Sequence, residues 1–333
     1  MEEFAGRVYP CLPLILKNIF CVMHDAKLGI QSSEVSLVFV HNHRFESNLA
    51  RLDQLFGERF HHIQHLVPFY RGAVQNVIPV YDSSHRFENF FAQGQPQFLN
   101  AGCTHYLFCA DDLILNPRLN ESNLCAELGL DEHSGYIKFL EPITEVPFVW
   151  PHTTGALAAL AGNNGTNWKM ELPDEPVACE RFGAHGLKVG QLSLRQFKKG
   201  IRPKQALQFL NYVALRVRNG ARSWKEIAHP PYPLIAGYAD LLVVPAEAVA
   251  NFCHYCGVFA AAGVFVELAA STALALSCRR VVCEKDVKWK GIEYWGKHID
   301  DFGKSRDYSL KTLYERFPPE QLYIHPIKLS KWK

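Results

Sequence analysis

The stretch Thr104-His105-Tyr106-Leu107-Phe108-Cys109-Ala110-Asp111-Asp112 leads from a run of mainly apolar side chains directly to two acids. Such a run is typical of a strand that is buried on both faces, as in a parallel sheet flanked by helices. In open α/β sheets, ligands bind beyond the carboxyl ends of the strands, because the connecting loops leave a crevice there. The stretch therefore predicts an α/β fold in which Asp111 and Asp112 lie at the ligand-binding edge of the sheet.

Strand and helix patterns alternate on the amino-terminal side of this stretch. Strands are predicted at 35–40, 63–69 and 74–81, and apolar residues at helical spacing predict helices at 45–60 and 85–99. This order is typical of βαβ units and of a mixed, mainly parallel sheet flanked by helices.

The carboxyl-terminal side is less regular. Residues 145–230 show no clear period, so their structure is left open. Residues 235–245 predict a further strand, which carries Asp240, and two helices are predicted at 246–256 and 257–278.

Composition indicates an ordinary globular protein. The 333 residues are 48% hydrophobic, enough for a large core without disulfides or metals. The formal net charge of +2 gives no overall field that would attract nucleic acid or an anionic membrane. Most of the ten cysteines lie in apolar runs, which indicates reduced thiols and a cytoplasmic protein. Cys253 and Cys256 have the spacing of a redox or zinc pair, but no second pair exists and their apolar surroundings favour packing.

Residues 1–33 are predicted to form a helical extension. No signal peptide is evident, because two acids follow Met1 and because prolines and polar residues interrupt the apolar stretch 9–23. This stretch is also too short to span a bilayer. We expect the helix after Pro13 to pack on the domain; the alternative is a peripheral contact with the inner face of a membrane.

The adjacent acids Asp111 and Asp112 need a positive partner. Two carboxylates about 4 Å apart repel by about 4 kcal/mol at an effective dielectric constant near 20. A hard divalent cation such as Mn²⁺ or Mg²⁺ fits this need, and diphosphate oxygens would complete its ligand shell. The alternative is a turn or helix cap in which one acid accepts hydrogen bonds from backbone N–H groups.

The segment from His105 to Pro117 resembles the "DxD"-type motif of GT-A glycosyltransferases, in its Asp-Asp form. The resemblance covers residues 34–117 and the final dozen residues. It implies a Rossmann-like nucleotide-diphospho-sugar transferase fold, with a nucleoside-diphosphate sugar as donor. It also implies that Asp112 is a metal ligand and that Asp111 binds either the metal or the ribose.

Nucleoside contacts are expected after two of the predicted strands. By the same resemblance, Asn42, His43 and Arg44 occupy the place where GT-A enzymes bind the base and ribose. The alternative for Asn42 is a helix N-cap. Asp82, directly after the strand that ends in Tyr81, is a similar candidate, and its alternative is to cap the following helix.

The tail from Leu322 to Trp332 resembles the end of glycogenin-like and lipopolysaccharide galactosyltransferase-like enzymes. The resemblance implies that His325 is the third metal ligand and that Lys328 or Lys331 contacts the diphosphate. The glycines usual in such tails are missing here.

Two further acids, Asp240 and Glu267, are candidates for a catalytic base. An inverting transferase needs a carboxylate to accept the proton of the acceptor hydroxyl, whereas a retaining enzyme does not. Both acids stand in apolar segments, where an unpaired charge is costly. We favour Glu267 as the base; the alternative for each acid is a structural role with an Arg or backbone partner.

The expected function is transfer of a monosaccharide to a glycan or lipid-linked glycan acceptor, as in bacterial surface polysaccharide synthesis. The alternatives are a sugar nucleotidyltransferase and a non-catalytic protein of the same fold that binds sugar nucleotides or glycans. We expect one domain with a nucleotide-binding half (34–117), an acceptor-side half (118–285) and a tail that closes the site (286–333).

Overall fold

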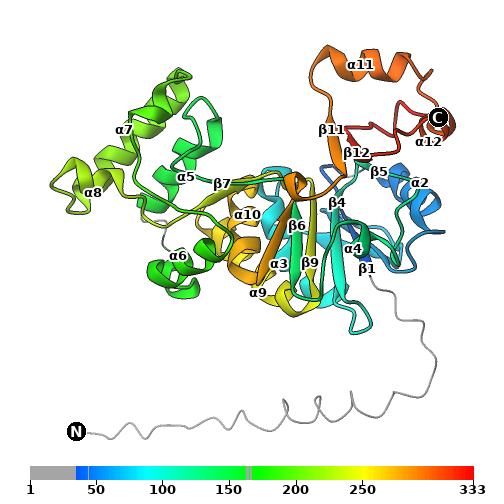
Figure 1. Cartoon of the computed structure of the whole chain (residues 1–333), viewed down its shortest axis with the longest axis horizontal. Coiled ribbons are helices and arrows are strands. Elements are labelled where there is room, and N and C mark those ends of the chain that lie inside the picture. The colour runs from blue at the N-terminus through cyan, green and yellow to red at the C-terminus, as the bar shows by residue number, and fades with distance from the viewer. Residues whose placement is uncertain (1–34, 44, 163–164, 166) are drawn as a thin grey trace, which may run out of the picture. The chain divides into compact units, whose positions relative to one another are not determined.

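The computed structural model describes residues 35–43, 45–162, 165 and 167–333. Within these ranges the chain forms one unit around a seven-stranded sheet (Figure 1). The predicted helix in residues 1–33 and the candidate residue Arg44 lie outside the described residues.

The seven-stranded sheet is mixed and mainly parallel, as predicted. Its order is β10-β6-β9-β4-β1-β2-β3. The strands are β1 (Val35–Val40), β2 (Ile63–Pro68), β3 (Val77–Val80), β4 (His105–Ala110), β6 (Ser134–Ile137), β9 (Leu241–Pro245) and β10 (Arg280–Cys283). Only β9 runs antiparallel to its neighbours, β4 and β6. The parallel pairing of β1 with β4 sets Val40 opposite Ala110, so the residues that follow the two strands lie side by side.

Three helices cover one face of this sheet: α3 (Phe87–Phe98), α9 (Ala246–Ala261) and α10 (Val266–Ser277). Val38 and Val40 of β1 pack on this side, whereas Leu37 and Phe39 pack on the other, as the alternation of side chains along a strand requires. Both faces of β1 are therefore buried, which is why all of its residues except Ser36 are apolar.

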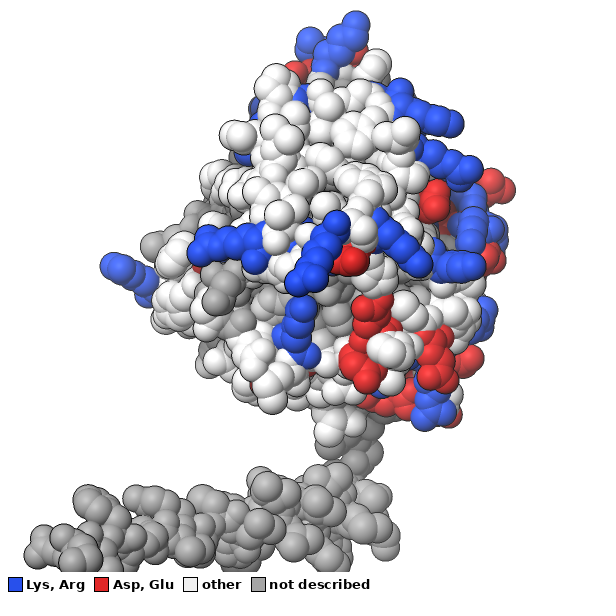
Figure 2. Space-filling view, turned by 90° about the vertical axis from the view of Figure 1, so that its left-hand side faces the viewer, with Lys and Arg blue, Asp and Glu red and all other residues white. Residues whose placement is uncertain are grey.

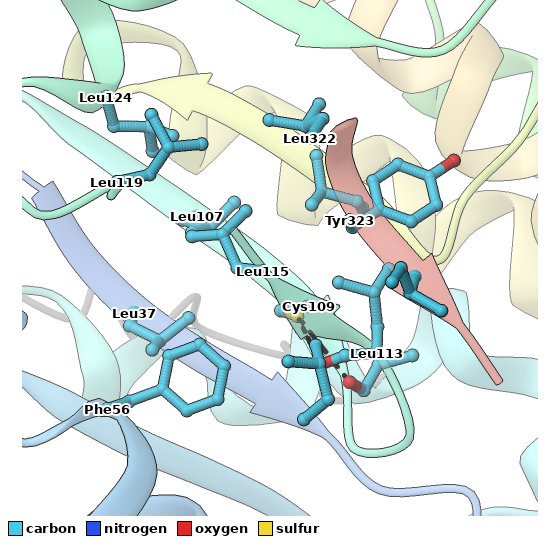
Figure 3. Packing of buried hydrophobic residues seen from close by; sticks show 14 of the residues in the cluster. Leu37, Phe56, Leu107, Cys109, Leu113, Leu115, Leu119, Leu124, Leu322 and Tyr323 are labelled. Carbon is cyan, nitrogen blue, oxygen red and sulfur yellow. Dashed lines mark hydrogen bonds between the residues drawn. The ribbon is translucent and has the colours of Figure 1, made fainter. Parts of the chain in front are cut away.

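The opposite face is covered by α2 (Glu46–Phe56), α4 (Leu124–Glu127) and a three-stranded sheet of order β11-β12-β5. The strands of this small sheet are β5 (Ile114–Leu115), β11 (Lys290–Glu293) and β12 (Gln321–His325), and two helices, α11 (Lys297–Lys304) and α12 (Leu310–Glu315), lie between β11 and β12 in the chain. In Figure 3, Leu322 and Tyr323 of β12 lie beside Leu107 and Leu115. This packing seats the carboxyl-terminal strand next to the acids that follow β4.

Residues 145–230, whose pattern was unclear from the sequence, are mainly helical. They contain α5 (Pro151–Ala161), α6 (Glu175–Ala184), α7 (Pro203–Arg218) and α8 (Trp224–Ala228). A two-stranded sheet, β7 (Leu140–Pro142) with β8 (Ile235–Gly237), connects them to the main sheet. They share a buried core with α9 and α10, and this core includes Phe148, Leu157 and Tyr212. Short 3₁₀ helices complete the secondary structure at Ser84–Arg86, Trp168–Glu171, Leu194–Phe197 and Glu284–Asp286.

Two boundaries predicted from the sequence are wrong. Residues 235–245 are not one strand, because the chain leaves β8 at Gly237 and enters β9 of another sheet at Leu241. The helix break expected at 256/257 falls instead after Ala261, since Gly263 has a φ of +78° that a helix cannot accommodate, whereas Gly257 stays helical.

Cys253 and Cys256 are buried in α9, and burial raises the pKa of both thiols. Inert packing is the expected behaviour of such cysteines. Among the described residues, no helix combines the length and the apolar character needed to cross a membrane.

Candidate active site

A cleft of about 380 Å³ opens at the carboxyl ends of β1 and β4. The loop after β1, the acids after β4 and the tail after β12 form its walls. The lining residues used below are Asn42, His43, Phe45, Asp111, Asp112 and Lys328. The cleft thus gathers predicted site residues from three separate parts of the chain.

Asp111 is buried and held by hydrogen-bonding groups. Its Oδ1 accepts a hydrogen bond of 3.2 Å from the backbone N–H of Asn42, and its Oδ2 lies 3.4 Å from Nδ1 of His41. The side chain of Asn48 forms a further hydrogen bond. Burial alone would raise the pKa of Asp111, but these contacts outweigh it and lower the pKa, so the carboxylate stays ionised with both oxygens engaged.

A row of polar side chains extends from Asp111 into the core. Nε2 of His41 lies 3.0 Å from Nδ1 of His65, and Nε2 of His65 lies 3.0 Å from Oδ1 of Asp53. Both imidazoles are fully buried. His41, His65 and Asp53 were not predicted as site residues. The signal in the sequence was a histidine directly after one apolar strand and another inside the next.

Asp112 faces the carboxyl-terminal tail. Its Oδ1 lies 3.0 Å from Nε2 of His325, which ends β12. Apart from this contact, Asp112 Oδ1 is buried and has no hydrogen-bond partner among the described residues. The approach is set by the backbone, because Ile324 pairs with Ile114 and the N–H of Ile327 donates to the carbonyl of Asp112.

The second nitrogen of His325 is oriented by Tyr238, whose hydroxyl lies 2.8 Å from Nδ1. Tyr238 in turn forms a hydrogen bond with the carboxyl of Asp240. Burial works against a charged imidazole, but the nearby carboxylates of Asp112 and Asp240 outweigh it and raise the pKa of His325. Tyr238 was not predicted as a site residue, because the sequence placed it inside a strand.

Asp240 lies in the bend between β8 and β9, not within a strand as predicted. Its carbonyl accepts a hydrogen bond from the N–H of Ala110, which fixes it beside the end of β4. Burial raises the pKa of Asp240. The acid therefore reaches the edge of the sheet that carries Asp112, although β9 runs antiparallel to β4.

Glu267 lies in the first turn of α10. Burial, together with the charge of Asp240, raises its pKa to about 7. Its carboxyl therefore belongs to the same group of acids as Asp240, but Glu267 does not line the 380 Å³ cleft. The structure brings the two candidate bases near each other and leaves Glu267 farther from the cleft than Asp112.

The remaining candidates divide into two groups. His43 and Lys328 line the cleft, and the ring of His43 meets that of Phe45 edge to face at 5.6 Å. Asp82 does not line it, because its carboxylate accepts hydrogen bonds of 2.7 Å from the N–H of Ser83 and from the side chain of Asn89.

Lys331 also points elsewhere, since its ammonium lies 3.4 Å from Asp300. Lys328 and Lys331 were equal candidates in the sequence, and Lys328 is the one that faces the cleft.

Asp112 and His325 are side chains of the kind that bind divalent cations. Their facing atoms lie 3.0 Å apart, the distance of a direct imidazole–carboxylate ion pair. In the part of the chain that is described, no group of three or more His, Cys, Asp and Glu side chains is arranged to hold a metal. The oxygens of Asp111 face His41 and Asn42, so a cation here would depend on ligands from a bound substrate.

A second hollow, a groove of about 300 Å³, lies beside β7 and β8. Its lining includes Phe139, Trp150, Lys199 and Ala236. Because Ala236 is in β8, which leads directly to Tyr238, the groove and the group of acids are connected by one short segment.

Comparison with known proteins adds no relative to this description. The chain matches no protein family, no curated protein and no solved structure. The fold and site define the class only as an α/β protein with an acidic cleft at the carboxyl ends of its strands. Any finer class rests on the side chains at this cleft.

Proposed function

We propose that this protein is a metal-dependent glycosyltransferase of the GT-A type. It would move a monosaccharide from a nucleoside-diphosphate sugar to a glycan or lipid-linked glycan acceptor. The observation that carries the proposal is the approach of Asp112 and His325, which come from distant parts of the chain and whose facing atoms lie 3.0 Å apart.

In this proposal Asp112 and His325 hold Mn²⁺ or Mg²⁺. The cation would supply positive charge for the diphosphate that leaves the sugar. Lys328, which lines the side of the cleft formed by the tail, would contact the same diphosphate. Tyr238 would orient His325 through Nδ1, as hydrogen-bonding neighbours do for metal-binding histidines.

The nucleoside would lie toward the loop after β1. His43 and Phe45 offer aromatic faces at the cleft, and the side chain of Phe45 is 51% exposed. A stacked base would cover this apolar surface. Asp111, whose oxygens are held by His41 and Asn42, keeps this loop next to β4.

The acceptor side is proposed to involve Glu267 and the groove that contains Trp150. A carboxyl with a pKa of about 7 is partly ionised at neutral pH, so Glu267 is suited to accept a proton from a hydroxyl. Asp240 is less suited, because its carboxyl is engaged by Tyr238. Trp150 offers an apolar face on which a sugar ring could stack.

A role in bacterial surface polysaccharide synthesis in the cytoplasm is the biological setting we propose. The buried, free thiols of the described residues support a reducing compartment.

The proposal is tested by donor binding and hydrolysis. Nucleoside-diphosphate sugars are screened by thermal shift with Mn²⁺ and with a chelator, using the wild type, Asp112→Ala and His325→Ala. A ligand at a hundred times its Kd stabilises a protein by about 2.7 kcal/mol. We expect one donor to stabilise the wild type only with metal, slow release of nucleoside diphosphate, and loss of both effects in the two variants.

The matched control is Lys311→Gln, an exposed change on α12 that should leave binding intact. Release of pyrophosphate from a nucleoside triphosphate and sugar phosphate would identify a nucleotidyltransferase. Binding without turnover for any acceptor would identify a non-catalytic protein. Full metal-dependent binding by Asp112→Ala would show that the site assignment is wrong.

A further inference from the structure

Residues 188–225, called the cationic segment below, carry an unusual local charge. The segment contains ten Lys and Arg residues and no Asp or Glu, whereas the rest of the chain contains 25 basic and 33 acidic residues. In Figure 2 the side of the molecule that carries α7 and α8 shows Lys and Arg side chains projecting over a largely uncharged surface, with the acidic side chains gathered mostly at one lower corner. The small net charge of the whole chain is therefore unevenly distributed, and the cationic segment is strongly positive.

Helix α7 within this segment is apolar on two sides. Phe209 and Tyr212 pack inward, and the ring of Phe209 lies 4.9 Å from that of Phe148. On the outer side, Leu207 and Leu210 are 69% and 64% exposed, and Val217 is 55% exposed. The outer residues recur at intervals of three and seven, so they form one stripe along the helix.

Two further large apolar side chains of the segment are exposed. Leu194 is 80% exposed and Trp224 is 52% exposed. Lys204 and Arg218 are exposed at the two ends of α7, next to the stripe. A contiguous apolar surface with a cationic border is typical of a docking surface and not of a free protein surface.

We propose that the cationic segment binds the surface of an anionic lipid membrane. Helix α7 would lie in the plane of the interface, with Leu207, Leu210 and Val217 among the acyl chains and the Lys and Arg side chains at the lipid phosphates. An amphipathic helix with a basic border has this mode of binding, and interfacial Trp residues strengthen it.

Two other occupants fit less well. A nucleic acid would satisfy the charge but would leave Leu207, Leu210 and Val217 in contact with water or phosphate. A second copy of the chain would cover the apolar stripe but would bring ten positive charges against ten others. Of these three occupants, the anionic bilayer is the one that matches both the positive charge and the apolar stripe.

This surface differs from the membrane contact that is the alternative for residues 1–33, and it does not depend on the proposed enzymatic activity. Lys199 belongs both to the cationic segment and to the 300 Å³ groove that contains Trp150. Docking through the segment would therefore bring this groove to the lipid surface.

The test is sedimentation of the full chain with vesicles of phosphatidylcholine alone and of phosphatidylcholine with 30 mol% phosphatidylglycerol. We expect binding to the anionic vesicles only, weakened by high salt. Leu207→Ser/Leu210→Ser should bind at least about tenfold more weakly, because the apolar contacts are lost. Its melting temperature should stay close to that of the wild type, because both side chains are exposed.

The matched control is Tyr81→Ser/Met170→Ser, which removes two apolar side chains that are 65% and 78% exposed outside the cationic segment. This variant should bind anionic vesicles as the wild type does. The proposal would be overturned if the wild type did not bind vesicles, or if the Leu207→Ser/Leu210→Ser variant bound them as well as the wild type does. It would also be overturned if light scattering showed a wild-type dimer that this variant does not form, or if the wild type bound DNA and not vesicles.

Discussion

Glu88 is a buried acid without a partner, and its replacement by Gln should make the protein more stable at neutral and alkaline pH. It lies in the first turn of α3 and is fully buried. Neither of its carboxyl oxygens has a hydrogen-bond partner among the described residues. Burial raises the pKa of Glu88 from 4.5 to about 8, so the folded chain keeps this carboxyl protonated at neutral pH.

The magnitude follows from the difference in proton binding between the two states. The unfolded chain releases the proton near pH 4.5, whereas the folded chain holds it until about pH 8. The free energy of unfolding therefore falls as the pH rises through this window, at about 1.4 kcal/mol per pH unit. From pH 4.5 to pH 7 the loss is roughly 3 kcal/mol, and by pH 9 it is roughly 5 kcal/mol.

The assay is urea unfolding of the wild type and Glu88→Gln at several pH values between 4 and 9. Gln has the same shape and does not titrate, so the stability of the variant relative to the wild type should increase by several kcal/mol across this range. Glu132→Gln, at a side chain that is 80% exposed, is the control for removing a carboxyl without burial. Parallel curves for Glu88→Gln and the wild type would refute the reasoning, because they would mean that the folded chain stabilises the charged carboxylate.

Three further predictions concern the site and its support. If Glu267 is the base, the transfer rate of the wild type should fall as the pH drops below about 7, to about a tenth of its plateau one pH unit lower. The residual activity of Glu267→Gln should not show this fall at acid pH. Lys328→Ala should weaken binding of the donor diphosphate by about tenfold or more in a titration, whereas Lys331→Ala should have little effect; the reverse order would contradict the assignment made from the cleft. Gly237→Ala should lower the free energy of unfolding, measured by urea denaturation, by about 1–3 kcal/mol, because the new Cβ would lie 2.6 Å from the carbonyl oxygen of Phe139. A variant as stable as the wild type would show that this bend can relax.

Much of the main sheet was predictable from the sequence, for a local reason. Strands β1 and β4 are buried on both faces, so nearly every residue in them is apolar and the pattern is unambiguous. The position of Asp111 and Asp112 at the end of β4 follows from the same pattern, because acids end the apolar run. These features depend on neighbours in the chain, which the sequence displays directly.

The different environments of the two acids were not predictable in this way. Asp111 is held because the pairing of β1 with β4 sets His41 beside it, and Asp112 meets His325 because β12 pairs with β5. Tyr238 joins the site only because the chain bends between β8 and β9 where the sequence suggested one strand.

The sequence by itself determined strands β1 to β4, helices α2 and α3 between them and the acidic end of β4, because period and burial leave a local pattern. Only the tertiary structure decided which polar atoms meet at the cleft and which apolar side chains of α7 stay exposed. The physical reason is that strand pairing and helix packing bring together residues that can be more than a hundred positions apart. A run of Leu and Val has the same pattern in the sequence whether its side chains pack inside the fold or stay exposed on its surface.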